Sequence, residues 1–305
     1  MKRYYGNPSL IPGIRHSMQF TKMQGVGNDF VVVNAAELDL GIPLPDLAKK
    51  LCDRKFGIGA DGLLVVSKDS NTRSVCRMQM FNPDGTEDMC GNGLRCVSLW
   101  AYRAGWLHGQ TQFTVAALDG PRTVELLSVS EDERTAEFRI DMGVPLFDPK
   151  QLPMRGADVL PDYVIRCPLM VDGDVYEITV INTGSTHTVI FGTPPTEKVF
   201  QTVSPLIENE RLFPERTSVL WATLRNPDTI DIRIWERGAG ETLGCGTGAC
   251  AVGVAAVVNH LAAPNTPLDI VSKGGTLRIV WPGEEAPVSM TGPAQIVYEG
   301  DFANA

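Results

Sequence analysis

The chain has 305 residues, of which 43% are hydrophobic, and its formal net charge is −9 at pH 7. That length and hydrophobic content suffice for a sizeable core and two domains, and the acidic balance argues against nucleic acid as a general partner. Seven cysteines, an odd number in a long chain, make a secreted disulfide framework unexpected and favour the reducing cytoplasm.

The two segments that resemble targeting or membrane sequences fall short of either. Residues 1–17 are basic and rich in turn-forming residues but lack the apolar stretch of a signal peptide, so we interpret them as an N-terminal extension. The longest apolar run, Ala249 to Val258, is about half of the ~20 residues that a membrane span needs. We therefore expect no contact with a membrane.

The first half of the chain predicts an alternation of strands and helices. Residues 18–23 and 30–33 are typical of two strands joined by a tight glycine turn. Residues 45–56 predict a helix with one apolar face, and residues 63–66 and 75–81 predict two further strands. Asn-Pro-Asp-Gly, directly after the last of these, is a strong turn signal.

The second half repeats this order after a meander and a linker. Residues 112–142 predict a meander of strands, and residues 148–161, with three prolines, are the predicted interdomain stretch. Strand, turn and strand then recur over residues 175–191, and further strands are expected through Ile234. Similar units in a similar order indicate an internal duplication.

Each half contains a cysteine followed by the same glycine frame. Residues 90–93 are Cys-Gly-Asn-Gly, residues 245–248 are Cys-Gly-Thr-Gly, and each motif leads into a helix-compatible stretch. A thiol where a loop enters a helix meets unpaired N–H groups and the positive end of the helix dipole, which favour the thiolate. If the halves face each other, the two thiols can flank one substrate.

The same loops are suited to binding an anion. Glycine lets the backbone approach closely, so the N–H groups of Gly91, Asn92, Gly246 and Thr247 are predicted to hold an amino-acid carboxylate. These donors would stabilise the enediolate-like transition state that forms when the α-proton leaves. One thiolate would take this proton and the opposite thiol would deliver another, which inverts the stereocentre without a cofactor.

Several separated motifs resemble the diaminopimelate epimerase family and occur in its order from about Met18 to beyond Gly292. They are residues 22–30, 81–85, 90–93, 213–216, 236–242 and 245–248. The resemblance implies a cytoplasmic, homodimeric isomerase of lysine biosynthesis that interconverts LL- and meso-diaminopimelate. It also implies that neither a cofactor nor a metal takes part.

The resemblance assigns roles to individual residues. Cys90 and Cys245 would be the base and the acid, and His187 and Glu236 would support the thiols and position the substrate amino group. The residues that would bind substrate are Asn28, Asn82, Gly91, Asn92, Ser185, Ser218, Glu236, Arg237, Gly246 and Thr247.

The implied fold is α/β of the mixed α+β kind, with two pseudo-symmetric domains and the active site in the cleft between them. Each domain would be a curved mixed sheet or barrel wrapped around a central helix. Residues 18–141 plus 293–305 would form the N-terminal domain, because the family's last strand returns to it, and residues 142–292 would form the C-terminal domain.

The chain departs from the family at several positions, including Thr186, where many members have Pro. Ser185 and Ser218 stand where many members have Asn, Gly62 where some have Gln, and Gln24 where many have His. Since Asn reaches farther than Ser, we expect water to bridge from the two serines to substrate. The chemistry is therefore better specified than the substrate.

Three other interpretations stay open. The chain could be a racemase of the same fold for another amino acid, or a redox or binding protein in which Cys90 and Cys245 form a reversible disulfide. Zinc is disfavoured because the cysteine spacings fit poorly and the chain has only four histidines. At single positions, His187 could be structural, Glu236 and Arg237 an exposed pair, and Asn28 a left-handed turn residue.

Overall fold

The computed structural model describes residues 17–38, 41–69 and 74–303. The predicted N-terminal extension, residues 1–17, lies outside this description except for its last residue. The first-half elements are β1 (Met18–Gly25), β2 (Asn28–Asn34), η2 (Ala35–Glu37), α1 (Leu44–Cys52), β3 (Gly62–Ser67), β4 (Cys76–Phe81), β5 (Glu87–Asp88), α2 (Gly91–Arg103), β6 (Gln112–Ala117), β7 (Gly120–Val129) and β8 (Thr135–Asp141). The second-half elements are β9 (Cys167–Val171), β10 (Asp174–Asn182), β11 (Thr186–Phe191), α3 (Glu197–Glu208), β12 (Ser218–Asn226), β13 (Thr229–Glu236), β14 (Gly240–Thr242), α4 (Gly246–Val258), β15 (Leu268–Ser272), β16 (Gly275–Val280) and β17 (Ser289–Phe302).

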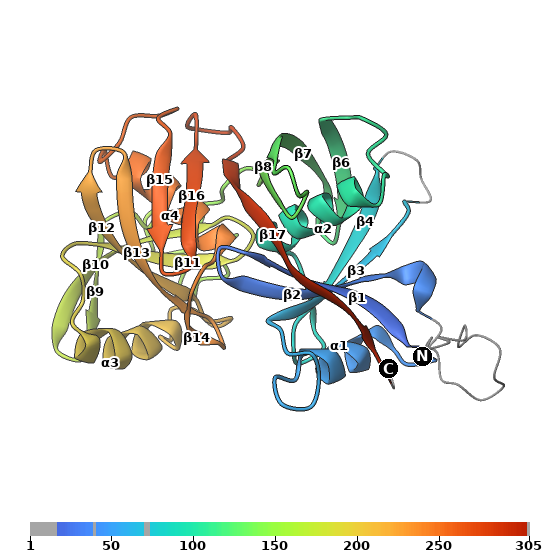
Figure 1. Cartoon of the computed structure of the whole chain (residues 1–305). Coiled ribbons are helices and arrows are strands. Elements are labelled where there is room, and N and C mark those ends of the chain that lie inside the picture. The colour runs from blue at the N-terminus through green and yellow to red at the C-terminus, as the bar shows by residue number, and fades with distance from the viewer. Residues whose placement is uncertain (1–16, 39–40, 70–73, 304–305) are drawn as a thin grey trace, which may run out of the picture.

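Two lobes repeat one topology, as the sequence predicted (Figure 1). In the first lobe β2 and β3 pair in parallel, β4 returns antiparallel and pairs in parallel with β6. In the second lobe β11, β12, β13 and β15 pair in the same order and the same directions. The crossover helices α1 and α3 also correspond. The α/β fold with two pseudo-symmetric lobes is confirmed.

Each lobe wraps its sheet around one buried helix. Helix α4 contacts β10, β11, β12, β15 and β16, and α2 contacts β1, β2, β3, β4 and β8. Most side chains of both helices are buried, because strands cover them on several sides. An apolar helix such as α4 is stable only in such an enclosure. None of the helices in the described ranges has both the length and the apolar character to cross a membrane.

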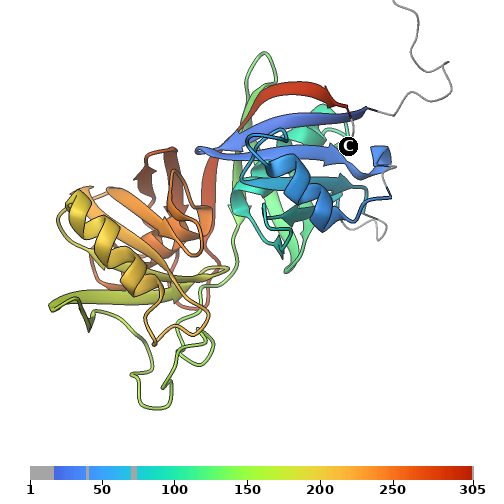
Figure 2. The ribbon, with the colours of Figure 1, turned by 90° about the horizontal axis from the view of Figure 1, so that it is seen from below.

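Strand β17 joins the two lobes. Its first residues pair with β16, residues 289–295 pair with β8, and residues 295–302 pair with β1. Figure 2 shows this last part lying along β1 on the first lobe. The pairing of residues 295–302 with β1 agrees with a last strand that returns to the first lobe. The domain bounds, residues 18–141 plus 293–305 and residues 142–292, stay a prediction.

The β1–β2 hairpin reaches from the first lobe to the second. Its two-residue turn, Val26 and Gly27, has φ values of 48° and 81°, and such a conformation is unusual for a β-branched residue. A Cβ atom at either Gly244 or Gly274 would collide with the Val26 carbonyl, so the hairpin tip lies directly on second-lobe backbone.

Three details of the predicted elements were wrong. Helix α1 ends at Cys52 rather than at residue 56, because the Asp53 carboxylate accepts hydrogen bonds from the Lys55 and Phe56 N–H groups at 2.7 and 2.8 Å and forms a turn. Residues 197–208 form α3, where only strands were expected; Thr196 caps this helix by accepting from the Val199 N–H.

The proline-rich segment 148–161 is also not a linker between the lobes. Its Leu152 and Met154 are buried in a cluster made of second-half residues. The chain crosses earlier, where Met142 donates its N–H to the Val288 carbonyl and Leu146 bridges to Asn182. Burial of the apolar residues between the prolines holds this segment in the second lobe, so its turn-forming residues do not mark a domain boundary.

Replacing Gly253, in the middle of α4, with Ala should destabilise the fold. Alanine favours a helix by about 0.5–1 kcal/mol over glycine. Here, however, its Cβ would lie 2.6 Å from Ile279 Cγ2, and overpacking of this kind costs about 1–3 kcal/mol. Thermal unfolding should show a lower Tm for Gly253→Ala.

Gly192→Ala is the matched control, because no atom lies within 4 Å of the position its Cβ would take. Its stability should stay within about 0.5 kcal/mol of the parent or rise slightly. An equal or higher Tm for Gly253→Ala would contradict close packing of α4 against β16.

Candidate active site

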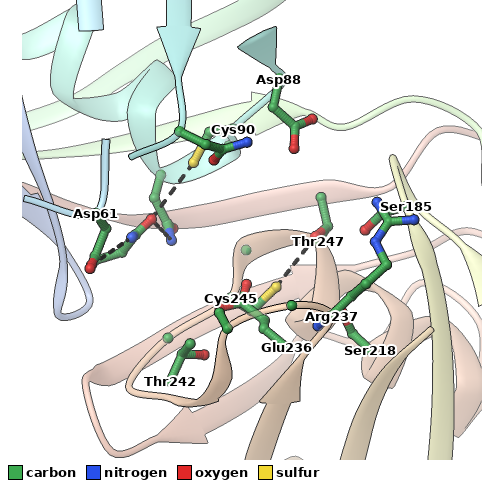
Figure 3. Close-up of a pocket in the computed structure, with 18 of the residues that line it drawn as sticks. Asp61, Asp88, Cys90, Ser185, Ser218, Glu236, Arg237, Thr242, Cys245 and Thr247 are labelled. Carbon is green, nitrogen blue, oxygen red and sulfur yellow. Dashed lines mark hydrogen bonds between the residues drawn. The ribbon is translucent and has the colours of Figure 1, made fainter. Parts of the chain in front are cut away.

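A cavity of about 540 Å³ lies between the lobes and contains residues of both cysteine motifs. Its first-lobe lining includes Asn28, Asp61, Asn82, Asp88, Cys90, Gly91 and Asn92. Its second-lobe lining includes Ser185, Arg216, Ser218, Glu236, Arg237, Thr242, Cys245, Gly246 and Thr247. Figure 3 shows Cys90 and Cys245 on opposite sides of this space.

Both cysteines are the N-caps of the buried helices, as their motifs predicted. Cys90 Sγ accepts the Gly93 N–H at 3.4 Å at the start of α2, and Cys245 Sγ accepts the Gly248 N–H at 3.3 Å at the start of α4. In each motif the second glycine supplies this N–H. The two sulfurs therefore have equivalent places in the two lobes.

The N–H groups at these positions favour the thiolate, as predicted, but burial of the two sulfurs outweighs them. Burial raises the pKa of Cys90 to about 11, although the N–H groups of Gly93 and Asn92 lower it. Burial and the nearby Glu236 carboxylate raise the pKa of Cys245 well above its ordinary value. Loss of solvation outweighs the helix N-terminus, so both groups are thiols at neutral pH.

Cys90 faces an amide. Its Sγ lies 3.7 Å from Asn28 Oδ1, which also accepts the Asn92 side-chain N–H at 3.2 Å. The Asn28 side-chain N–H donates in turn to the Asp61 carboxylate at 3.0 Å. The interpretation of Asn28 as a left-handed turn residue is wrong, because Val26 and Gly27 have the positive φ values.

Cys245 faces a hydroxyl and an imidazole. Its Sγ lies 3.4 Å from Thr247 Oγ1 and 4.0 Å from His187 Nε2, and this nitrogen is 3.0 Å from the same Thr247 oxygen. His187 is fully buried, and burial followed by the charge of Arg237 lowers its pKa to about 3. His187 is thus neutral at pH 7 and lies behind Cys245, outside the cavity lining.

Glu236 and Arg237 both line the cavity. Burial raises the pKa of Glu236, and the nearby Cys245 thiol and Thr242 hydroxyl partly offset this rise. The backbone N–H of Arg237 donates to Ser218 Oγ at 3.1 Å, and its guanidinium donates to the Glu215 carbonyl. Their contacts and their place in the cavity argue against the reading as an ordinary exposed pair.

Glu208, whose carboxylate fixes the segment that contains Glu236 and Arg237, was not predicted from the sequence. Glu208, at the end of α3, accepts the Trp235 indole N–H at 2.7 Å, the Gly238 backbone N–H at 2.8 Å and an Arg216 N–H at 3.1 Å. It therefore holds the chain on both sides of Glu236. Because α3 itself was not predicted, no local signal pointed to Glu208.

Asp61 was missed as well. It lines the cavity, accepts from Asn28 and pairs with Arg54 at 2.7 Å. The sequence hint was an acidic residue among glycines just before a predicted strand. On the same lobe, Asn82 lies at the cavity wall and donates its amide to Thr86 Oγ1 at 3.1 Å within the predicted turn.

The residues at the positions that depart from the family make contacts within the protein. Ser218 Oγ supports the Arg237 backbone, and Ser185 Oγ lies 3.4 Å from His187 Nδ1. Gln24 bonds Gln295 and the Gly27 N–H, which stabilises the hairpin. Gly62 is buried against Met80 and does not line the cavity. Water bridging from the serines stays a prediction.

The described residues contain no group of three or more His, Cys, Asp or Glu side chains that could hold a metal ion. All seven cysteines are free.

Comparison with known proteins places this geometry in a family. The family model described as diaminopimelate epimerase matches residues 20–147 and 179–297. A diaminopimelate epimerase from Moorella thermoacetica is 41% identical over 288 residues, with 93% of this chain and 99% of that protein covered. One from Desulforudis audaxviator is 40% identical, with 94% and 100% covered.

Solved structures share the fold at much lower identity. The structure of a hydroxyproline epimerase from Agrobacterium vitis superposes with a TM-score of 0.65 at 13% identity, and covers 94% of this chain and 91% of its own. This likeness bears on the fold alone.

The buried His187 should make stability depend on pH. An unfolded histidine has an ordinary pKa of about 6.5. Between that value and about 3, the unfolded chain binds a proton that the folded chain does not, so stability falls as the pH falls through this window. Each pH unit of decrease within this window lowers the free energy of unfolding by about 1.4 kcal/mol. Urea unfolding of His187→Asn should show a shallower loss of stability toward acid.

His260→Asn, at an exposed position, is the control for histidine replacement. Equal pH slopes for the parent protein and His187→Asn would contradict a neutral, buried imidazole.

Proposed function

This chain belongs to the diaminopimelate epimerase family of isomerases, and we propose that it interconverts LL- and meso-diaminopimelate in lysine biosynthesis. The observation that carries the proposal is the pair of cysteine N-caps facing each other across one cavity. A substrate carbon held between two such sulfurs can lose a proton to one face and gain a proton on the other. This is the requirement of a two-base epimerase.

We propose that the reacting carboxylate binds at the N-termini of α2 and α4. Gly91, Asn92, Gly246 and Thr247 line the cavity there, and the first N–H groups of a helix lack partners within it. These donors would stabilise the negative charge that moves onto the carboxylate as the α-proton leaves. The α-carbon would then lie between the two sulfurs.

The proton transfers balance without a cofactor. A thiolate on one side takes the α-proton and becomes a thiol, while the thiol on the other side gives its proton to the carbon and becomes a thiolate. The reverse reaction exchanges these roles. Glu236, whose charge raises the pKa of Cys245, and Asn28, which accepts from the Cys90 thiol, are the groups that would support the two states.

The remainder of the cavity suits a substrate with charges of both signs. Asp61 and Asp88 lie on the first-lobe side, and Arg216 and Arg237 on the second. We propose that Arg237, with Asn82, Ser185 and Ser218, binds the part of diaminopimelate that does not react. The distant ammonium and carboxylate groups would find partners of opposite charge.

We further propose that the enzyme is a cytoplasmic homodimer, as the family comparison implies. Seven free cysteines agree with a reducing compartment. Size-exclusion chromatography with light scattering tests the dimer, and a monomeric mass under assay conditions would refute it.

Proton NMR in deuterated water tests the reaction and the substrate together. The reduced protein is incubated with LL-diaminopimelate, meso-diaminopimelate, lysine or histidine. We expect exchange of the α-proton and inversion with diaminopimelate alone. Inversion of a different amino acid would keep the chemistry and overturn the substrate, and no exchange at all would favour a redox or binding protein.

Cys90→Ala and Cys245→Ala should each abolish stereoinversion. Loss of a positioned acid or base costs about 10²–10⁴-fold in rate. Cys167→Ala is the control, because this half-buried thiol on β9 does not line the cavity. Parental inversion rates in either of the first two variants would refute the two-base assignment.

The rate should also rise with pH. Because burial raises the pKa of both thiols, kcat/KM should increase from neutral pH upward as one thiolate forms more readily in the free enzyme. A profile that is flat over neutral and alkaline pH would show that thiol ionisation does not limit the reaction.

A further inference from the structure

Arg95 is a buried cation without a carboxylate partner. It lies in α2, just beyond the Cys90 motif, and is the largest fully buried side chain of the described residues. Its guanidinium donates to the Asn92 side-chain oxygen at 2.6 Å and to the carbonyls of Pro293 and Gly91 at 2.9 and 3.5 Å. Within the described ranges no Asp or Glu pairs with it, which is unusual for a buried charge.

Two glycines, one on each of two strands, leave space for the Arg95 side chain. A Cβ at Gly25 of β1 would lie 3.1 Å from Arg95 Nη2, and one at Gly292 of β17 would lie 3.5 Å from Arg95 Cζ. The Pro293 carbonyl of β17 accepts from Arg95 Nε between them. The backbone of β1 and β17 therefore surrounds the guanidinium and fixes its position.

A directed chain of hydrogen bonds leads from Arg95 to Cys90. A guanidinium can only donate, so the Asn92 oxygen faces Arg95 and the Asn92 N–H group is left to donate to Asn28 Oδ1 at 3.2 Å. Asn28 donates its own N–H group to the Asp61 carboxylate, which keeps Oδ1 directed at Cys90 Sγ. Both amide orientations thus depend on Arg95 at one end and Asp61 at the other.

The charge of Arg95 also affects the pKa of Cys90 more than the pKa of Cys245. It lowers the pKa of Cys90, against the larger effect of burial. The causes that set the pKa of Cys245 are burial, Glu236, Thr247 and Gly248. Cys245 therefore serves as an internal reference in the same molecule.

We propose that Arg95 is a positioning residue for Cys90: it orients the Asn92–Asn28 pair so that Asn28 Oδ1 accepts from the Cys90 thiol, and its fixed positive charge balances the thiolate that forms when this proton leaves. The role in catalysis rests on the proposed function. The effect on Cys90 ionisation does not depend on which amino acid is the substrate.

The test measures how fast each cysteine of the substrate-free, full-length protein is alkylated by iodoacetamide. Below the pKa, the rate at a fixed pH follows the thiolate fraction, and peptide mass spectrometry separates Cys90 from Cys245. In Arg95→Gln we expect alkylation of Cys90 to slow about threefold if the pKa rises by about one unit, because the smaller thiolate fraction is partly offset by greater nucleophilicity. Alkylation of Cys245 should be unchanged.

Arg95→Lys keeps the charge, so its Cys90 rate should stay closer to the parent than that of Arg95→Gln. Arg139→Gln, on the surface of β8, controls for loss of an arginine and should alter neither cysteine. Equal slowing of Cys90 and Cys245 in Arg95→Gln, or no change in either, would overturn the proposal.

Asn92→Asp provides a second measurement if Arg95→Gln does not fold. It places a carboxylate against Arg95 that neutralises its charge, and it removes the N–H donated to Asn28. Alkylation of Cys90 should again slow relative to Cys245, and an unchanged ratio of the two rates would overturn the proposal.

Turnover of diaminopimelate separates this inference from the proposed function. Arg95 does not line the cavity, so Arg95→Gln should lower kcat with little change in KM, and higher pH should restore part of the loss. An increase in KM with kcat unchanged would contradict a positioning role. Absence of turnover in the parent protein would refute the substrate while the alkylation result still decides the role of Arg95.

Discussion

The enclosure of two helices by curved sheets is the constraint on which the site depends. Because α2 and α4 are buried, their N-termini cannot move without moving the strands around them. Each first turn is closed by a cysteine sulfur that accepts an N–H three residues later. Two lobes built in this way bring two sulfurs to one cavity with the precision of a packed core.

The lobes are alike in backbone and unlike in the polar groups around each sulfur. Cys90 faces a neutral amide whose orientation is fixed from two sides, whereas Cys245 faces Glu236, Thr247 and a neutral imidazole. An enzyme that removes a proton from either face of a carbon must support both forms of each thiol. Different neighbours meet that need while the sulfurs keep equivalent positions.

Local sequence patterns predicted the repeated strands and the cysteine caps, because glycine frames and β-branched runs act over a few residues. The family resemblance added several of the polar residues that line the cavity. Neither predicted Glu208, Asp61 or the net direction of the thiol pKa shifts. Glu208 lies at the end of α3, a helix that was not predicted and that contains Pro205, a residue that argues against helix. Burial of the sulfurs comes from strands far away in the chain, so the motif alone did not indicate that burial outweighs the N–H groups.

The tip of the β1–β2 hairpin has a further consequence for the shape of the cavity. The Val26 carbonyl lies on Gly244 and Gly274, at a point where any side chain would act as a wedge between the lobes. Gly244 immediately precedes Cys245. Because Gly244 and Gly274 have no side chain, the hairpin tip can pack directly on the second lobe. The distance between the two sulfurs, and with it the width of the active site, therefore depends on these two glycines.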